Sequence, residues 1–119
     1  MNAVTTGYAL EEKAAQYLQK LGFYIISRNF RCKHGEIDLI ATHEQKIVFL
    51  EVRYRNSCSF GHPAESVTQR KQQKIIASAN FFLQTKPWVQ HSNCRFDVIA
   101  MTKNVYFPQI EWIKDAFNA

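Results

Sequence analysis

The chain contains two runs with the alternation of a β-strand, residues 35–41 and 47–55, joined by the polar segment 43–46. Side chains at every second position of a strand share one face, so Ile37 and Leu39 are expected on the same face of the first run. Two β-rich runs separated by a short polar segment are typical of a hairpin. The sequence therefore predicts an antiparallel hairpin, around which the rest of the chain must be arranged.

The predicted hairpin sets two carboxylates against each other. In the register that pairs Asp38 with Glu51, Glu36 lies opposite Arg53. Opposed like charges destabilise a sheet unless a cation or a shared proton compensates. Oxygen ligands of this kind suit Mg²⁺ or Mn²⁺. Two interpretations stay open: a metal site, or a charged solvent face crossed by ordinary salt bridges.

These two runs also resemble a known pattern. Residues 35–41 followed by 49–55 are similar to the YraN-like family of uncharacterised bacterial proteins, and the resemblance extends over nearly the whole chain. That family is similar to the PD-(D/E)XK nuclease superfamily, which includes Holliday-junction resolvases. The superfamily pattern is an acid on one strand and acid-x-Lys on the next. Asp38 matches the first acid, Glu51 matches the second, and Arg53 stands where the superfamily usually has lysine.

The resemblance implies a restriction-endonuclease-like α/β fold, with a mixed central sheet flanked by helices in the order α-β-β-β-α-β-β. It further implies a Mg²⁺- or Mn²⁺-dependent endonuclease that hydrolyses phosphodiester bonds in nucleic acid, DNA in the first place and branched DNA included. Asp38, Glu51 and Glu11 would hold the metal, and Arg53 would complete the catalytic set.

Arg53 weakens the case for catalysis. An arginine stays protonated at any working pH, so it can clamp a phosphate but cannot serve as a base. A non-catalytic nucleic-acid-binding module on the same fold is therefore the alternative function. A structural protein whose charged hairpin makes only salt bridges is a third.

The N-terminal segment has helical spacing and predicts a helix from about Tyr8 to Leu21. Thr5 or Thr6 is the expected cap, and Gly22 is the expected stop. The predicted buried stripe consists of Leu10, Ala14, Tyr17, Leu18 and Leu21.

Two adjacent glutamates in this helix differ in position. At about 100° per residue, Glu12 points away from the apolar stripe, whereas Glu11 lies at its edge. An edge glutamate is commonly a paired surface acid. The Gly7-x-x-x-Glu11 spacing resembles the start of YraN-like proteins, and related nucleases use a helix glutamate here as a further metal-site acid.

Cations gather in three places: the segment 28–34, the end of the hairpin, and the start of a second predicted helix. Cations at a helix N-terminus oppose the helix dipole, so a phosphate is an attractive partner for them. The alternative is that they are solvated. The expected nucleic-acid contacts are Arg55, Arg70, Lys71, Lys74, Arg31 and Lys33.

The remaining elements follow from periodicity and turn residues. We predict a strand at 23–27, loops at 28–34 and 56–63, a helix from a Thr68 cap to about Thr85, a strand at 94–102, an edge strand at 105–113 and a helical tail at 114–119. The buried stripe of the second helix would be Ile75, Ile76, Ala79, Phe82 and Leu83.

The composition bounds the class of protein. With 119 residues, 46% of them hydrophobic, the chain is predicted to form one domain, residues 1–119. No apolar run has the length of a membrane span, so we expect a cytoplasmic protein without a membrane partner. A net charge of +5 favours a polyanionic partner such as nucleic acid. Whether the substrate is DNA or RNA, and whether the protein forms a homodimer, stays open.

Overall fold

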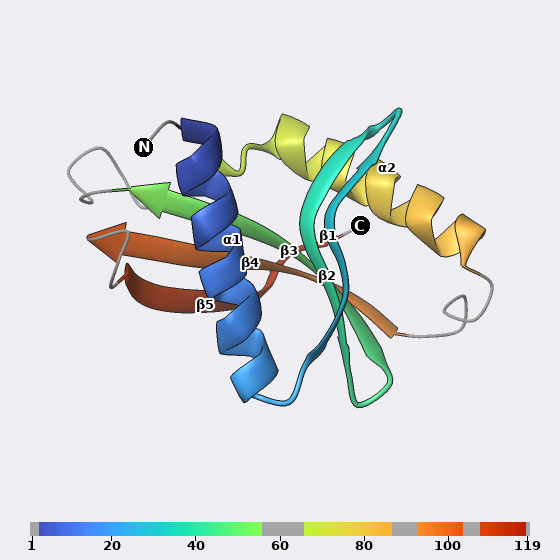
Figure 1. Ribbon diagram of the computed structural model, residues 1–119. Helices are drawn as coiled ribbons and strands as arrows, with labels where there is room; N and C mark the ends of the chain where they lie inside the picture. The colour runs from blue at the N-terminus through green and yellow to red at the C-terminus, as the bar shows by residue number, and fades with distance from the viewer. Residues whose placement is uncertain (1–2, 56–65, 87–92, 104–107, 119) are drawn as a thin grey trace.

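The computed structural model describes residues 3–55, 66–86, 93–103 and 108–118. The described part contains α1 (Ala3–Lys20), β1 (Tyr24–Cys32), β2 (Gly35–His43), β3 (Lys46–Arg55), α2 (Gln69–Thr85), β4 (Asn93–Lys103) and β5 (Pro108–Phe117), as Figure 1 shows. The predicted order α-β-β-β-α-β-β is confirmed. The predicted loop at 56–63 lies outside the described residues. No helix in the described ranges is long and apolar enough to cross a membrane.

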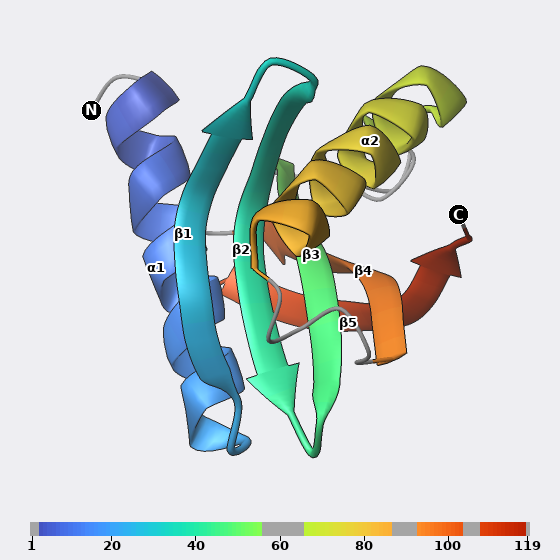
Figure 2. The same cartoon turned by 90° about the vertical axis from the view of Figure 1, so that its right-hand side faces the viewer.

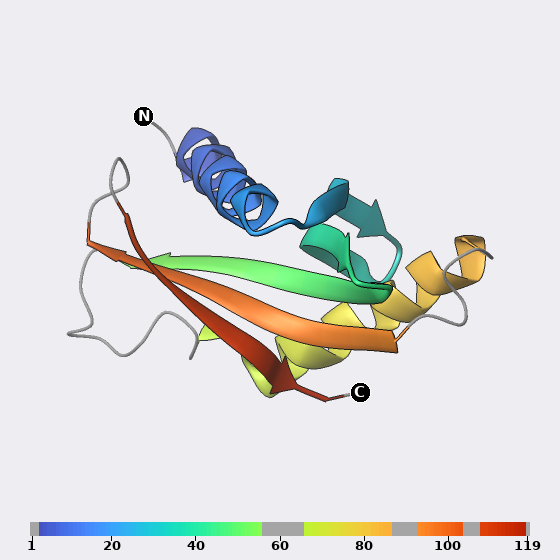
Figure 3. The same cartoon turned by 90° about the horizontal axis from the view of Figure 1, so that it is seen from below.

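The five strands form one mixed sheet in which they follow one another in chain order (Figure 2). β3 and β4 are parallel, and the other neighbouring strands are antiparallel. A parallel pair needs a crossover connection, and the connection between β3 and β4 contains α2. α1 and α2 lie on opposite faces of the sheet (Figure 3). The predicted α/β class with a flanked mixed sheet is therefore confirmed.

The hairpin of β2 and β3 has the predicted register from Leu39 opposite Leu50 to His43 opposite Lys46. Its two central turn residues, Glu44 and Gln45, have φ of 51° and 67°. Left-handed values at both positions are those of the tight turn whose twist matches a hairpin.

The two strands separate beyond Leu39 and Leu50, where their pairing ends. The Asp38 carboxylate there accepts a hydrogen bond from the Val52 backbone N–H at 2.8 Å. A side chain thus replaces the main-chain acceptor, and the predicted extension of the ladder past Leu39 is wrong. We call the opening between the separated strands the fork.

The fork also changes the face of one predicted core residue. Ile37 packs in the cluster under α2, with Ile40 and Phe49, and not with Leu39 under α1. Beyond the fork, β2 stays paired with β1, where Ile37 lies opposite Phe30. Strict alternation of the two faces therefore fails between Ile37 and Leu39.

Each face of the sheet carries its own buried cluster. The cluster under α2 contains Ile40, Phe49, Ile75, Ala79, Phe82 and Phe96 among others, and the cluster under α1 contains Leu10, Ala14, Leu18, Leu39, Leu50 and Ile99 among others. Burial of these side chains is the main stabilising force of such a fold. Leu10, Ala14 and Leu18 of the stripe predicted for α1 are buried, but the prediction is wrong for Leu21, which lies past the end of the helix and is 47% exposed.

The end of α1 is as predicted, but its start is not. Gly22 has φ of 94°, and the Phe23 N–H donates to the Leu18 carbonyl at 3.1 Å, which is the glycine stop of a Schellman motif. The helix begins before Thr5 and Thr6, so neither is its cap. The residues ahead of them are compatible with a helix, and no local signal stops it there.

The boundaries of α2 are confirmed. The Thr68 hydroxyl accepts from the Lys71 N–H at 3.3 Å as the N-cap, and the helix continues to Thr85. Ile75, Ala79 and Phe82 are buried on the predicted stripe.

Two other segments differ from their predictions. The predicted loop at 28–34 is mostly strand, because β1 runs on to Cys32 and pairs with β2. The predicted tail at 114–119 is not helical, because β5 continues to Phe117, whose ring stacks on Phe96 with centroids 5.1 Å apart. Both segments are polar and gain their strand partners only in the folded sheet.

A buried carboxylate ties β4 to β5. Asp97 is fully buried and accepts from Arg95 Nε at 2.9 Å, Trp112 Nε1 at 2.7 Å and the Asp115 N–H at 2.8 Å. Asp115 has φ of 53° at an irregularity in the β4–β5 ladder, which turns its N–H toward Asp97. The irregular end of β5 is thus held by one side chain.

We expect Asp97→Ala to lower the free energy of unfolding by about 3–5 kcal/mol, because it leaves the Arg95 guanidinium part-buried without its acceptor. Urea denaturation measures the change. The matched control is Glu12→Ala, which removes an exposed ion pair with Arg28 and should cost only about 0–1 kcal/mol. Equal losses in the two variants would show that Asp97 is not the anchor.

Candidate acidic site in the fork

The fork opens into a concavity of about 350 Å³ between the separated strands and the start of α2. Its charged lining consists of Glu36, Asp38, Glu51, Arg53, Lys71 and Lys74. Three acids therefore face three cations in one small space. The site residues predicted from the hairpin, Asp38, Glu51 and Arg53, all meet here.

Asp38 is placed by β2 and held by the backbone of β3. One carboxylate oxygen accepts from the Val52 N–H at 2.8 Å, which fixes the side chain across the fork. Burial raises the pKa of Asp38, while the Val52 N–H and the Arg53 charge oppose that rise. The carboxylate is thus oriented by the same contact that separates the strands.

Glu51 is almost fully buried, with 5% of its surface exposed. Its Oε2 accepts from Arg53 Nη2 at 2.9 Å, while its Oε1 is buried without a hydrogen-bond partner. Burial, followed by the negative charge of Asp38, raises its pKa to about 8. A carboxylate in this position favours either a proton or a cation.

Glu11 reaches the same group of acids from α1. Burial and the nearby Asp38 charge raise its pKa to about 7, and a hydrogen bond with Asn29 opposes the rise. Its Oε2 is buried without a partner. The neighbouring Glu12 is exposed and pairs with Arg28 at 3.2 Å, so the predicted difference between the two glutamates is confirmed.

Three buried polar atoms at this site lack a hydrogen-bond partner: Glu11 Oε2, Glu51 Oε1 and Arg53 Nε. Buried polar atoms are nearly always paired, because an unpaired one costs about 1–3 kcal/mol. Two unpaired acceptors and one unpaired donor grouped around the fork are a pattern typical of a site where a ligand completes the bonding.

The three acids are neighbours without forming a finished coordination shell. Among the described residues, no group of three or more carboxylate, imidazole or thiol side chains is arranged to hold a metal ion. One oxygen of Glu51 is engaged by Arg53, and one oxygen of Asp38 is engaged by Val52. A cation would be met by the remaining oxygens.

The predicted phosphate contacts divide into two groups. Lys71 and Lys74 line the pocket from the first turns of α2, whereas Arg70 is exposed beside it and is not part of the lining. Lys33 is exposed at the β1–β2 turn, away from the lining. The side chain of Arg55 lies outside the described residues.

Glu36 does not form the predicted pair with Arg53. It forms an exposed ion pair with Arg31 at 3.3 Å, since these two residues lie opposite each other on β2 and β1. The hairpin register could not reveal this, because the β2–β3 pairing ends at Leu39 and Leu50, whereas β2 stays paired with β1 at Glu36. Arg31 is therefore linked to the pocket rim through Glu36.

Sequence reasoning missed two supports of the site. Asn29 contacts Glu11 from a left-handed position with φ of 53°, within a segment predicted to be a loop. Gly35 has φ of 145°, a value that favours glycine, in the β1–β2 turn next to Ser78 and Lys74 of α2. A glycine can be recognised in the sequence as a turn residue. No sequence signal predicts the contact of Asn29 with Glu11.

The comparison with known proteins identifies the family. The profile of the uncharacterised protein family UPF0102 matches residues 10–101, a span that includes every predicted site residue. The chain belongs to this family. UPF0102 proteins of Hahella chejuensis and Saccharophagus degradans are 48% and 46% identical, covering 99% and 95% of this chain and 94% and 92% of their own lengths. A UPF0102 protein of Lachnoclostridium phytofermentans is 40% identical, covering 100% of this chain and 98% of its own.

The raised pKa values predict a pH-dependent stability. Ionisation of Glu51, with a pKa raised from 4.5 to about 8, and of Glu11, raised to about 7, is disfavoured in the folded chain. The folded state therefore holds more protons, and this stabilisation is complete below about pH 4.5 and is lost as the pH rises to about 8. We expect Glu51→Gln to raise the melting temperature of metal-free protein at about pH 8 and to flatten its pH dependence.

Thermal melts in EDTA between about pH 5 and about pH 8 test this expectation. Glu12→Gln is the control, since that side chain is exposed and should leave the profile unchanged. If Glu51→Gln melts with the wild-type pH profile, burial of Glu51 is not what sets the slope.

Proposed function

We propose that this protein is a metal-dependent phosphodiesterase that cleaves nucleic acid, with DNA, branched DNA included, as the first substrate to test. The observation that carries the proposal is the pair of unpaired buried atoms Glu51 Oε1 and Arg53 Nε, in residues that line a pocket with Lys71 and Lys74, together with unpaired Glu11 Oε2 on the acid next to Asp38. Free carboxylate oxygens call for a cation, and a free guanidinium N–H calls for an anion. A divalent ion next to a phosphodiester satisfies both.

The three acids supply the type of ligand atom that such an ion binds. Carboxylate oxygens are the ligands that Mg²⁺ and Mn²⁺ prefer, and these ions commonly bind through one or two carboxylates plus water and phosphate. Asp38, Glu51 and Glu11 would hold the ion. When bound, it lowers the pKa of water and neutralises charge on the phosphate. A bound cation would also offset the effects of burial and of the Asp38 charge, which raise the pKa of Glu11 and Glu51.

Arg53 would act on the phosphate and not as a base. Its Nη2 is engaged by Glu51, and its Nε is buried and free. A guanidinium stays charged and offers hydrogen bonds in a fixed plane, so Arg53 can bind a phosphate oxygen as negative charge develops there. Lys71 and Lys74, on the α2 side of the same pocket, would hold the flanking phosphates.

The superfamily resemblance of the hairpin supports the same conclusion. The acid on β2 and the acid-x-Arg on β3 line one pocket, and the helix glutamate lies next to the β2 acid; the resemblance to the PD-(D/E)XK pattern implies a grouping of this kind. The substitution of arginine for lysine is the departure from that pattern.

A non-catalytic nucleic-acid-binding module is the second candidate. The ion pair of Arg53 with Glu51 at 2.9 Å favours it, because this contact partly neutralises the acid without any metal. A module of this kind would bind nucleic acid through Lys71 and Lys74 whether or not Mg²⁺ is present.

Cleavage of linear, flap and four-way-junction DNA, and of matched RNA, with Mg²⁺ or Mn²⁺ separates the two candidates. We expect metal-dependent cleavage that Asp38→Ala abolishes and that Arg53→Ala slows by about 10²-fold, the scale of one lost transition-state contact. Arg53→Lys should retain or raise activity, since it keeps the charge. In parallel, Mg²⁺ should raise the melting temperature of the wild type but not of Asp38→Ala.

Glu12→Gln, an exposed acid on the same helix as Glu11, is the matched control and should behave as the wild type in both assays. Inert wild-type and Arg53→Lys proteins that still bind nucleic acid would make the binding module the correct function. Failure of Mg²⁺ to shift the melting temperature would remove the metal site as well.

The role of the α2 lysines is tested by the salt dependence of binding. We expect Lys71→Ala and Lys74→Ala each to lower the slope of log affinity against log salt by about one unit, since each removed cation releases one fewer counterion. Lys86→Ala, an exposed lysine at the far end of α2, should leave the slope unchanged. An unaltered slope in the first two variants would mean that these lysines are solvated and do not contact phosphate.

A further inference from the structure

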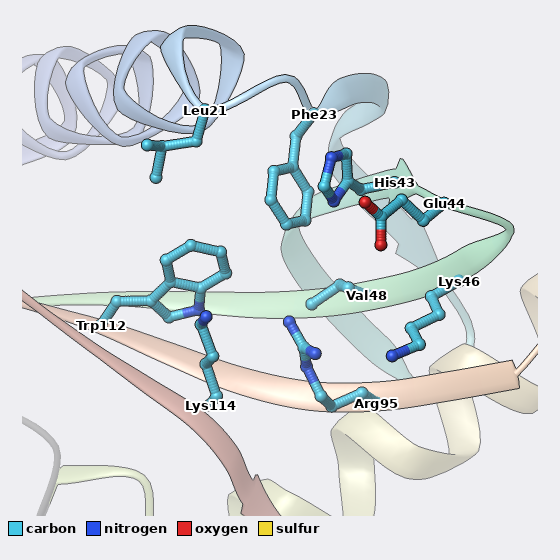
Figure 4. A pocket seen from close by; sticks show the side chains of 9 residues that line it. All are labelled: Leu21, Phe23, His43, Glu44, Lys46, Val48, Arg95, Trp112 and Lys114. Carbon is cyan, nitrogen blue, oxygen red and sulfur yellow. The ribbon is translucent and has the colours of Figure 1, made fainter.

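A second concavity of about 360 Å³ lies at the opposite end of the hairpin from the fork (Figure 4). It is bounded by the end of α1, the β2–β3 turn and the neighbouring parts of β3, β4 and β5, with Val48 at its base. Its volume is within the usual range for small-molecule sites. The acids of the fork do not line it, so it is a separate site.

One wall of this pocket is aromatic. The ring of Phe23 stacks on His43 with centroids 4.5 Å apart and meets Trp112 edge-on at 5.2 Å. Figure 4 shows the three rings grouped above and beside the open space. These rings come from three separate segments, and they offer flat surfaces and edges to a planar ligand.

The opposite side is cationic. Lys46, Arg95 and Lys114 line it from three different strands, and Glu44 is the only exposed acid in the described lining. Within the described part of the chain, neither Lys46 nor Glu44 has an ion-pair partner, and Lys114 Nζ lies 4.5 Å from the Trp112 ring centroid. This imbalance favours an anionic ligand.

Arg95 is held in place before any ligand arrives. Buried Asp97 accepts from Arg95 Nε at 2.9 Å and from Nη2 at 3.0 Å, and it also accepts from Trp112 Nε1 at 2.7 Å. One rigid carboxylate thus positions both a cation and an aromatic ring. The Nη1 amino group of Arg95 makes no hydrogen bond within the described structure, so it stays available to an acceptor.

The concavity continues beyond Arg95. An adjoining pocket of about 210 Å³ shares Lys46 and Arg95 and extends along the start of β4 to Asn93. The two cations therefore stand between two hollows. A ligand larger than a single ring and phosphate has room to continue past them.

We propose that this pocket binds a nucleoside phosphate, with the base against Phe23 and Trp112 and the phosphate between Lys46 and Arg95. Aromatic rings that accept a base next to cations that accept a phosphate are the usual means of holding an unpaired nucleotide. The ligand is either a free nucleotide or an unpaired nucleotide within a nucleic-acid strand. The strand as the source rests on the proposed function. His43 and Asp38 are five residues apart on β2, so the pocket and the fork are about 17 Å apart along the strand.

The test uses the fluorescence of Trp112 in a Trp88→Phe background, where it is the single tryptophan of the chain. Titrations are made in EDTA with dAMP, adenosine and a 5′-phosphorylated tetrathymidylate. We expect dAMP and the tetranucleotide to quench Trp112 saturably, and adenosine to bind about tenfold more weakly, because it lacks the phosphate. A tetranucleotide that binds more tightly than dAMP assigns the site to a strand, and equal affinities assign it to the free nucleotide.

Lys46→Glu is expected to weaken both phosphorylated ligands about tenfold, since it exchanges an attractive charge for a repulsive one. Lys86→Glu carries the same charge change on an exposed residue outside the lining and should have no effect. Absence of saturable quenching, or equal affinities in Lys46→Glu and Lys86→Glu, would overturn this proposal.

The Asp38→Ala protein keeps the two proposals apart. Because Asp38 does not line this pocket, that variant should still bind dAMP with wild-type affinity. Cleavage without dAMP binding would leave the proposed function intact and refute the nucleotide pocket. Binding of dAMP without cleavage of nucleic acid would support the nucleotide pocket and refute the proposed enzyme. A dAMP affinity that falls in Asp38→Ala would place the nucleotide in the fork and refute the pocket.

Discussion

The hydrogen bond from the Val52 N–H to the Asp38 carboxylate is the contact on which the site depends. It replaces the ladder bond that would otherwise keep β2 and β3 together, and so it opens the fork. The same bond orients Asp38 toward Glu51 and leaves space that α2 closes from one side. A continuous ladder at this point would give a flat charged strand face with no pocket.

The electrostatics of the fork follow from its burial. Glu11 and Glu51 each have a buried oxygen without a partner, and Asp38 lies beside both. Carboxylates this close repel one another unless a proton or a cation compensates their charge. A protein that kept them for stability alone would lose little by replacing them, because buried charges are costly even when paired. Their grouping supports the cation site that we propose.

The sheet offers two different chemical environments at the two ends of one hairpin. At the fork, acids and lysines face each other around unpaired atoms. At the turn, Asp97 holds Arg95 and Trp112 in fixed positions beside a space lined by cations and rings. Both environments depend on an aspartate that accepts hydrogen bonds from a neighbouring strand, part-buried Asp38 at the fork and fully buried Asp97 at the turn. Such carboxylates orient their surroundings more strictly than apolar packing does.

The sequence by itself determined the elements with strong local signals. Alternation gave the hairpin and its register, the Thr68 cap and the apolar stripe gave α2, and Gly22 gave the end of α1, because each depends on residues close in the chain. The pattern of acids also predicted that Asp38 and Glu51 lie close together. Only the tertiary structure revealed the fork, the continuation of β5 to Phe117 and the pocket beside the β2–β3 turn. These features depend on contacts such as Asp38 with Val52 and Asp97 with Trp112, which join positions far apart in sequence and have no local periodicity.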